Sequence, residues 1–148
     1  MKLSIRKSRR YVPKGVDIKD IILGDDTVGY IYPVDGEDHR GIWKINDNRD
    51  GWSETPDGYA VELKDSVYQR EIFKALTGTQ YDGTNFFWWD RKPTITIFPT
   101  LGEARKFARD NFGSPDKLRS YLVEIILAVM RGRADYHIQL NKELEDEA

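Results

Sequence analysis

Apolar and polar residues alternate through the first two-thirds of the chain with the period of two that is typical of β-strands. Leu3 and Ile5 each stand between polar neighbours, and strand-favouring residues are concentrated in 27–34, 41–45 and 59–63. A glycine-containing turn joins the first two of these ranges, so they predict a β-hairpin.

Pro33 lies inside the first range of that hairpin. Because proline has no backbone N–H, it predicts that the strand ends there or lies at an edge of the sheet. Two runs of aromatic and β-branched residues, FFWW at 86–89 and TITIF at 94–98, give the strongest strand predictions. Together these segments predict an antiparallel sheet.

The apolar period changes to that of a helix over 65–76, where apolar residues recur at i, i+4, i+7 and i+8. Asp65 or Ser66 is expected to cap the start of this helix, and Gly78 to stop it. A second helix is predicted at 101–112, because Thr100 and Glu103 have the spacing of a capping box.

A third helix is predicted to start at Ser114 as its cap. Residues 118–130 are apolar nearly all round and predict a C-terminal buried helix at the centre of the core. Gly132 interrupts the pattern, and 134–144 fits either a continued helix or a strand. Strands followed by helices favour an α+β fold, with an antiparallel sheet in the first two-thirds and helices packed on one face.

The length of 148 residues corresponds to a single domain that can bury a core without disulfides. Charge is distributed unevenly, which divides the chain into a basic N-terminal arm at 1–19 and one α+β domain at 20–148. The arm carries seven basic residues and one acid, a net +6, whereas residues 20–57 carry −7 and residues 141–148 carry −3. Such a dipolar layout can steer a partner by its field.

Composition excludes several classes of function. The formal charge of −2 argues against both a basic nucleic-acid packer and an acidic DNA mimic, and the absence of cysteine excludes thiol chemistry. No apolar run of the ~18 residues needed for a membrane span is present. The first sixteen residues lack the apolar core of a secretory signal, so we expect a cytoplasmic protein.

The aromatic strand is the first candidate for a binding surface. Phe86 to Trp89 alternate between two faces of a strand, and Arg91 and Lys92 follow. If Trp88 or Trp89 faces solvent, the strand forms a stacking platform for nucleic acid or an anchor for a protein. The alternative is a strand buried on both faces, since aromatic residues are usually part of the core.

Two basic clusters are further candidates. Arg6, Arg9 and Arg10 lie in the arm and are of the kind that contacts phosphates. Arg105 and Arg109 share one face of the predicted second helix, with Lys117 and Arg119 at the start of the next. The alternative interpretations are a solvated terminus and the ordinary polar face of an amphipathic helix.

Catalytic and metal-binding motifs are weak. Residues 46–57 follow the spacing of a calcium loop, but Asn46 and Asp57 replace the expected end ligands and the flanks read as strands. The acidic turn at 35–39 contains His39, and His137 lies far along the chain. We therefore assign no catalytic residue, no metal ligand and no cofactor, and we expect a protein that is not an enzyme.

These observations favour a small non-enzymatic binding module that recognises another macromolecule, with a protein as the preferred partner and a regulatory or inhibitory role. One alternative is nucleic-acid binding through the basic arm and the aromatic strand. A second is a metal-dependent hydrolase that uses the acidic loops. The oligomeric state stays open.

Overall fold

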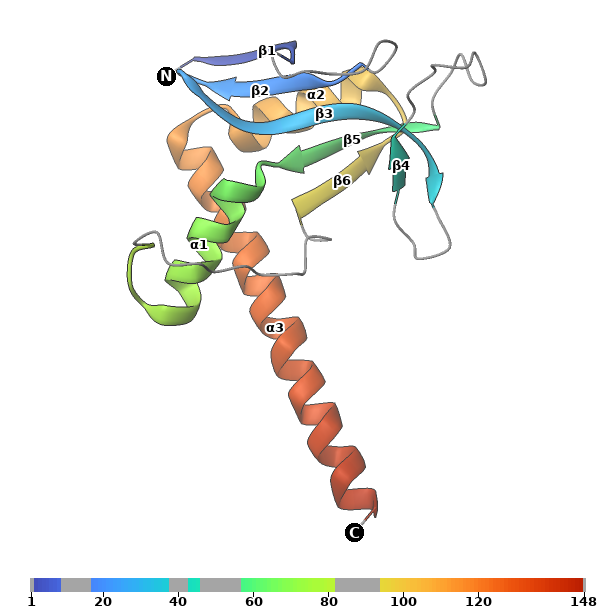
Figure 1. Ribbon diagram of the computed structural model, residues 1–148, viewed down its shortest axis with the longest axis vertical. Helices are drawn as coiled ribbons and strands as arrows, with labels where there is room; N and C mark the ends of the chain where they lie inside the picture. Colours follow the sequence, from blue (N-terminus) through green and yellow to red (C-terminus); the bar gives the residue numbers. More distant parts are fainter. Residues whose placement is uncertain (1, 9–16, 38–42, 46–56, 82–93, 148) are drawn as a thin grey trace.

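Residues 2–8, 17–37, 43–45, 57–81 and 94–147 are described by the structure, which is a computed structural model (Figure 1). Side chains of the last helix are described as far as Gly132. An antiparallel sheet precedes the helices that cover it, which confirms the predicted α+β class.

Six strands make up the described part of the sheet. They are β1 (Leu3–Lys7), β2 (Lys19–Leu23), β3 (Asp26–Glu37), β4 (Trp43–Ile45), β5 (Gly58–Leu63) and β6 (Ile95–Phe98). Five follow the order β1-β2-β3-β5-β6, β4 pairs with β3, and every pair is antiparallel. The strand predicted from Leu3 and Ile5 is β1, and the predicted hairpin is β3 with β4.

The expectation that Pro33 ends a strand or marks an edge is wrong. It lies within β3, a central strand that pairs with both β2 and β5, and the strand continues to Glu37. Pro33 pairs with Tyr59 of β5, while on the other side the pairing with β2 ends at Ile31 and the pairing with β4 begins at Val34. Proline is tolerated because it falls between these two ladders, where its missing N–H has no strand partner.

Helix α1 (Asp65–Thr77) confirms the first predicted helix. Its N-cap is Lys64, which makes no side-chain cap hydrogen bond, so the expected cap at Asp65 or Ser66 is wrong. Asp65 lies in the first turn instead, where it accepts a hydrogen bond from Gln69 Nε2 at 3.3 Å. Gly78 ends the helix as predicted, with a φ of 72° that glycine adopts without strain.

Helix α2 (Leu101–Phe112) begins at the predicted cap, where Thr100 Oγ1 accepts a hydrogen bond from the Glu103 N–H at 3.2 Å. Helix α3 (Pro115–Glu147) follows its predicted cap, Ser114, whose Oγ accepts a hydrogen bond from the Lys117 N–H at 3.2 Å. Residues 134–144 continue this helix, so Gly132 does not interrupt it. The C-terminal half of α3 extends away from the sheet (Figure 1).

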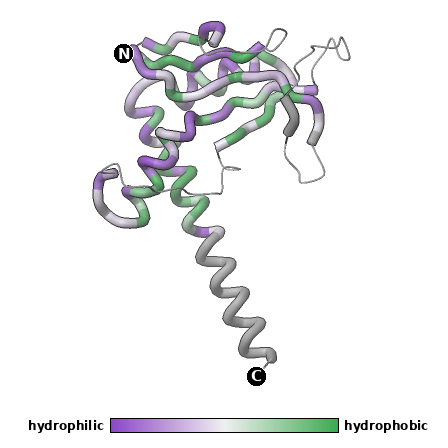
Figure 2. Tube along the Cα trace, viewed as in Figure 1, coloured by the Kyte–Doolittle hydropathy of each residue, from purple (hydrophilic) through white to green (hydrophobic). Residues whose placement is uncertain are grey.

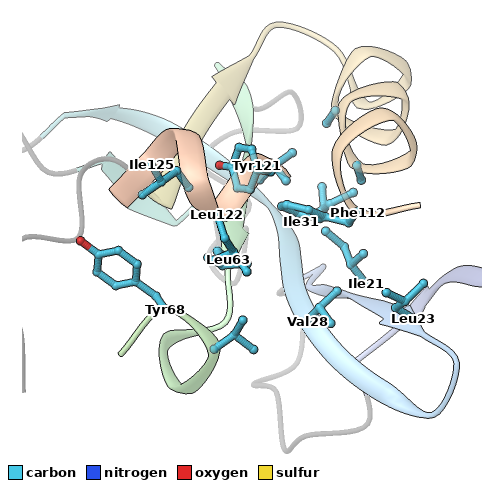
Figure 3. Packing of buried hydrophobic residues seen from close by; sticks show 14 of the residues in the cluster. Ile21, Leu23, Val28, Ile31, Leu63, Tyr68, Phe112, Tyr121, Leu122 and Ile125 are labelled. Carbon is cyan, nitrogen blue, oxygen red and sulfur yellow. The ribbon is translucent and has the colours of Figure 1, made fainter. Parts of the chain in front are cut away.

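One buried cluster joins the helices to a single face of the sheet. Residues of β2, β3 and β5 point into it, and all three helices contribute to it (Figure 3). The sheet supplies Ile21, Leu23, Val28, Ile31, Val61 and Leu63, and the helices supply Tyr68, Ile72, Ala104, Ala108, Phe112, Tyr121, Leu122, Ile125 and Val129, among others. Figure 2 shows the apolar segments along the strands and the first half of α3.

Helix α3 is buried on one stripe rather than all round. Leu122, Ile125 and Val129 are buried, whereas Val123 and Leu127 are 51% and 50% exposed. The predicted C-terminal buried helix therefore contributes one stripe to the core, and its other face is exposed. Helices α1 and α2 pack against α3, and they leave Val123 and Leu127 on its uncovered face.

Candidate binding surfaces

Several of the predicted partner-binding residues lie outside the described residues. These are Arg9, Arg10, Trp88, Trp89, Arg91 and Lys92. The predicted strand at 86–89 and most of the calcium-like loop at 46–57 lie there as well. The described candidates are Arg6, Arg105 and Arg109.

Arg6 and the two helical arginines do not share a surface. Arg6 is paired in register with Asp20 of β2, and it lines a cavity of about 350 Å³ with Asp20, Tyr30 and Lys64. Its neighbour in β1, Ile5, packs against the core cluster on the helix side. Because successive strand residues point to opposite faces, Arg6 lies on the face away from α2.

Arg105 and Arg109 do come together, and Lys117 joins them. They line a cavity of about 500 Å³ with Leu3, Ile5 and Gly113, which we call the cationic pocket. Helix α2 supplies the arginines one turn apart, and the first turn of α3 supplies the lysine. The structure thus brings Arg105, Arg109 and Lys117 together, whereas Arg119 does not line this pocket.

A larger groove of about 920 Å³ runs between α1, α3 and the turn that joins β2 to β3. We call it the α1–α3 groove. Its apolar lining comes from all three parts: Leu23, Val28, Val67, Ala75, Pro115, Leu118, Leu122, Val123, Ile126 and Leu127. The half-exposed Val123 and Leu127 belong to this lining, so the groove presents apolar surface to solvent.

The charged residues of the α1–α3 groove are mainly basic. Lys64, Arg70, Lys74 and Arg119 line it together with the acids Asp26 and Glu71, a net charge of +2. Arg70 Nε lies 4.0 Å from Glu71 Oε1, and Arg119 Nη1 lies 3.9 Å from Asp116 Oδ1. These contacts are exposed and contribute little to stability. The groove is therefore apolar with a cationic border.

Sequence reasoning did not find this groove, although a signal for it was present. Segment 118–130 is apolar on more faces than a helix packed on one side of a sheet requires. This excess is compatible with a buried central helix, and it also fits a helix with one apolar face left open. Val123 and Leu127 are four residues apart and lie on that open face.

Tyr121 is an ionisable residue of the described core. Burial raises the pKa of Tyr121 above its ordinary value of 10.0, the negative charge of Glu124 raises it further, and a hydrogen bond with Thr96 lowers it. Tyr121 packs edge-on against Phe107 and Phe112, with ring centroids 5.8 and 5.1 Å away. This hydroxyl links α3 to β6 within the packed interior.

Within the described ranges, no group of three or more His, Asp or Glu residues is placed to hold a metal ion. Asp35 of the predicted acidic turn lies in β3 and accepts a hydrogen bond from the Asp57 N–H at 3.4 Å, while Asp38 and His39 lie outside those ranges. No described helix is long and apolar enough to cross a membrane.

Comparison of the chain with protein-family models, with curated proteins and with solved structures gives no match.

Proposed function

We propose that the protein is a non-enzymatic binding module that recognises another protein through the α1–α3 groove. By occupying a surface of a larger assembly it would act as a regulator or inhibitor. The observation that carries the proposal is the half-exposed pair Val123 and Leu127 beside the apolar lining of the groove. Contiguous apolar surface rimmed by polar residues is typical of sites that bind proteins.

The shape of the groove suits a helix as its occupant. Two helices, α1 and α3, form its walls, and apolar residues of both line the space between them. An amphipathic helix binds such a groove by inserting its apolar face, with anchors spaced at i, i+3, i+4 and i+7.

The charge of the border selects an acidic partner. Lys64 and Lys74 form no ion pair with a described residue. The described lining of the groove carries a net charge of +2. Opposite charges around an apolar contact increase the association rate and disfavour basic partners. The proposed partner is thus a protein that presents an amphipathic helix with acidic flanks.

The test is a pull-down from native lysate with matched variants. Leu127→Glu places a charge in the groove, and Ala128→Glu places the same charge on the next exposed residue of α3, outside the groove. The wild type and Ala128→Glu should capture the same protein, and Leu127→Glu should reduce its capture about tenfold or more. Half of each sample is treated with nuclease beforehand.

Carbodiimide cross-linking then identifies the contact, because it joins a lysine amine directly to a carboxylate. We expect a link from Lys64 or Lys74 to an acidic helix of the captured protein. Equal capture by Leu127→Glu and Ala128→Glu would contradict the proposal. Capture that disappears with nuclease would favour nucleic-acid binding instead. A link to the acidic residues 143–147 of another copy would show self-association rather than a separate partner.

A further inference from the structure

The cationic pocket is separate from the α1–α3 groove. Both touch the first turn of α3, but Lys117 lines the pocket whereas Leu118 and Arg119 line the groove. Among the residues that the structure describes, the three charged ones that line the pocket are basic: Arg105, Arg109 and Lys117. No described acid lines it, so its charge is not balanced by its own walls.

The close approach of α2 and α3 brings these charges together. Gly113 forms the corner between the two helices, and a Cβ added there would collide with the Arg109 carbonyl oxygen. Only glycine therefore fits this corner. On the opposite side, β1 closes the pocket with Leu3 and Ile5, which are half-buried against the core.

One guanidinium N–H of this pocket has no acceptor among the described residues. Arg105 Nε is shielded from solvent and makes no hydrogen bond. Asp116, which precedes Lys117 in the sequence, has its Oδ1 3.9 Å from Arg119 Nη1 and does not line the pocket. Buried polar groups are almost always hydrogen-bonded in native proteins, so the shielded Nε–H of Arg105, beside two more cations, favours an anion as its acceptor.

We propose that the cationic pocket binds the phosphate group of a small phosphomonoester. Guanidinium groups bind phosphate oxygens in pairs, and the lysine adds a compact positive charge. A volume of about 500 Å³ is in the range of small-molecule sites. Leu3 and Ile5 provide apolar contact for the organic part of the ligand, which a bare oxyanion does not have.

The experiment is an NMR titration of the full-length, ¹⁵N-labelled protein with phenyl phosphate at constant ionic strength. The amides of Gly113 and Lys117 should shift and saturate. Arg109→Gln and Lys117→Gln change exposed residues of the pocket, and each should weaken binding about tenfold. Lys106→Gln is the matched control, because Lys106 is an exposed cation of α2 that does not line the pocket. It should retain the wild-type affinity.

Further probes distinguish the sources of the phosphate. Inorganic phosphate that binds less tightly than phenyl phosphate would support a phosphomonoester, and equal affinity would overturn the role of the apolar contact. A single-stranded oligonucleotide that binds more tightly than phenyl phosphate, and is weakened by the same variants, would reassign the pocket to nucleic acid. An absence of saturable shifts, or an equal loss in Lys106→Gln, would overturn the proposal.

Discussion

The hydroxyl of Tyr121 is a polar group inside an otherwise apolar cluster. Its ring is packed by Phe107 and Phe112, and its hydroxyl is hydrogen-bonded to Thr96. Burial disfavours the tyrosinate and raises the pKa of Tyr121 above 10.0. The residue therefore holds its proton more tightly in the folded protein than in the unfolded chain.

This difference predicts a loss of stability in alkali. The contribution is complete below pH 10, the unfolded pKa, and is lost as the pH rises through the higher folded pKa. Urea unfolding between pH 8 and 11 should show a steeper fall in the free energy of unfolding for the wild type than for Tyr121→Phe. At neutral pH the variant should lose about 0.5–1.5 kcal/mol with its hydrogen bond. Parallel pH profiles would contradict this assignment.

At the scale of elements, β3 and β5 approach so closely that one position has no room for a side chain. Gly29 of β3 is opposite Leu63 of β5, and a Cβ added to Gly29 would lie 2.5 Å from the Glu62 carbonyl oxygen. The obstacle is backbone, which cannot rotate away as a side chain can. Gly132 of α3 is the opposite case, because an added Cβ would have nothing within 4 Å.

The same substitution should consequently have opposite effects at these two glycines. Gly29→Ala should destabilise the protein by about 1–3 kcal/mol, because the strands must separate. Gly132→Ala should increase helix content and add up to about 1 kcal/mol to the helix, since alanine loses less backbone entropy there. Thermal unfolding followed by circular dichroism compares the two. A stable Gly29→Ala protein would show that the strands are further apart than described.

At the scale of the whole molecule, the packing of α3 decides which of its residues belong to the core. Leu122 is 8% exposed and Leu127 is 50% exposed, although they are only five residues apart. Leu122 packs in the cluster with Leu63 and Tyr68 (Figure 3). Leu127 borders the open α1–α3 groove. The placement of α3 on the sheet therefore separates a structural leucine from a candidate binding leucine.

Alanine substitutions test this placement directly. Leu122→Ala should cost about 2–5 kcal/mol of unfolding free energy, because it leaves a cavity in the core. Leu127→Ala should change the stability by roughly 0.5 kcal/mol or less, as surface substitutions do. Chemical denaturation of both variants with the wild type gives the comparison. Similar losses at the two positions would mean that the groove is closed in the folded protein.

The local elements could be predicted from the sequence because their signals are local. Thr100 and Ser114 cap helices through hydrogen bonds to residues three positions ahead, and Gly78 ends α1 through its own backbone angle. The alternation at Leu3 and Ile5 likewise identified β1. The prediction at Pro33 was wrong because the strands that pair with β3 decide whether a proline there is tolerated, and those strands lie elsewhere in the chain.

The candidate sites, like Pro33, depend on residues that are far away in the sequence. The sequence by itself determined the order and type of these elements and the face shared by Arg105 and Arg109, because hydrogen bonds and helix periodicity act over a few residues. Only the tertiary structure decided that Lys117 joins those arginines while Arg6 lies on the other face. It also decided that Leu127 stays exposed, because burial depends on which distant elements pack around a residue rather than on its own apolarity.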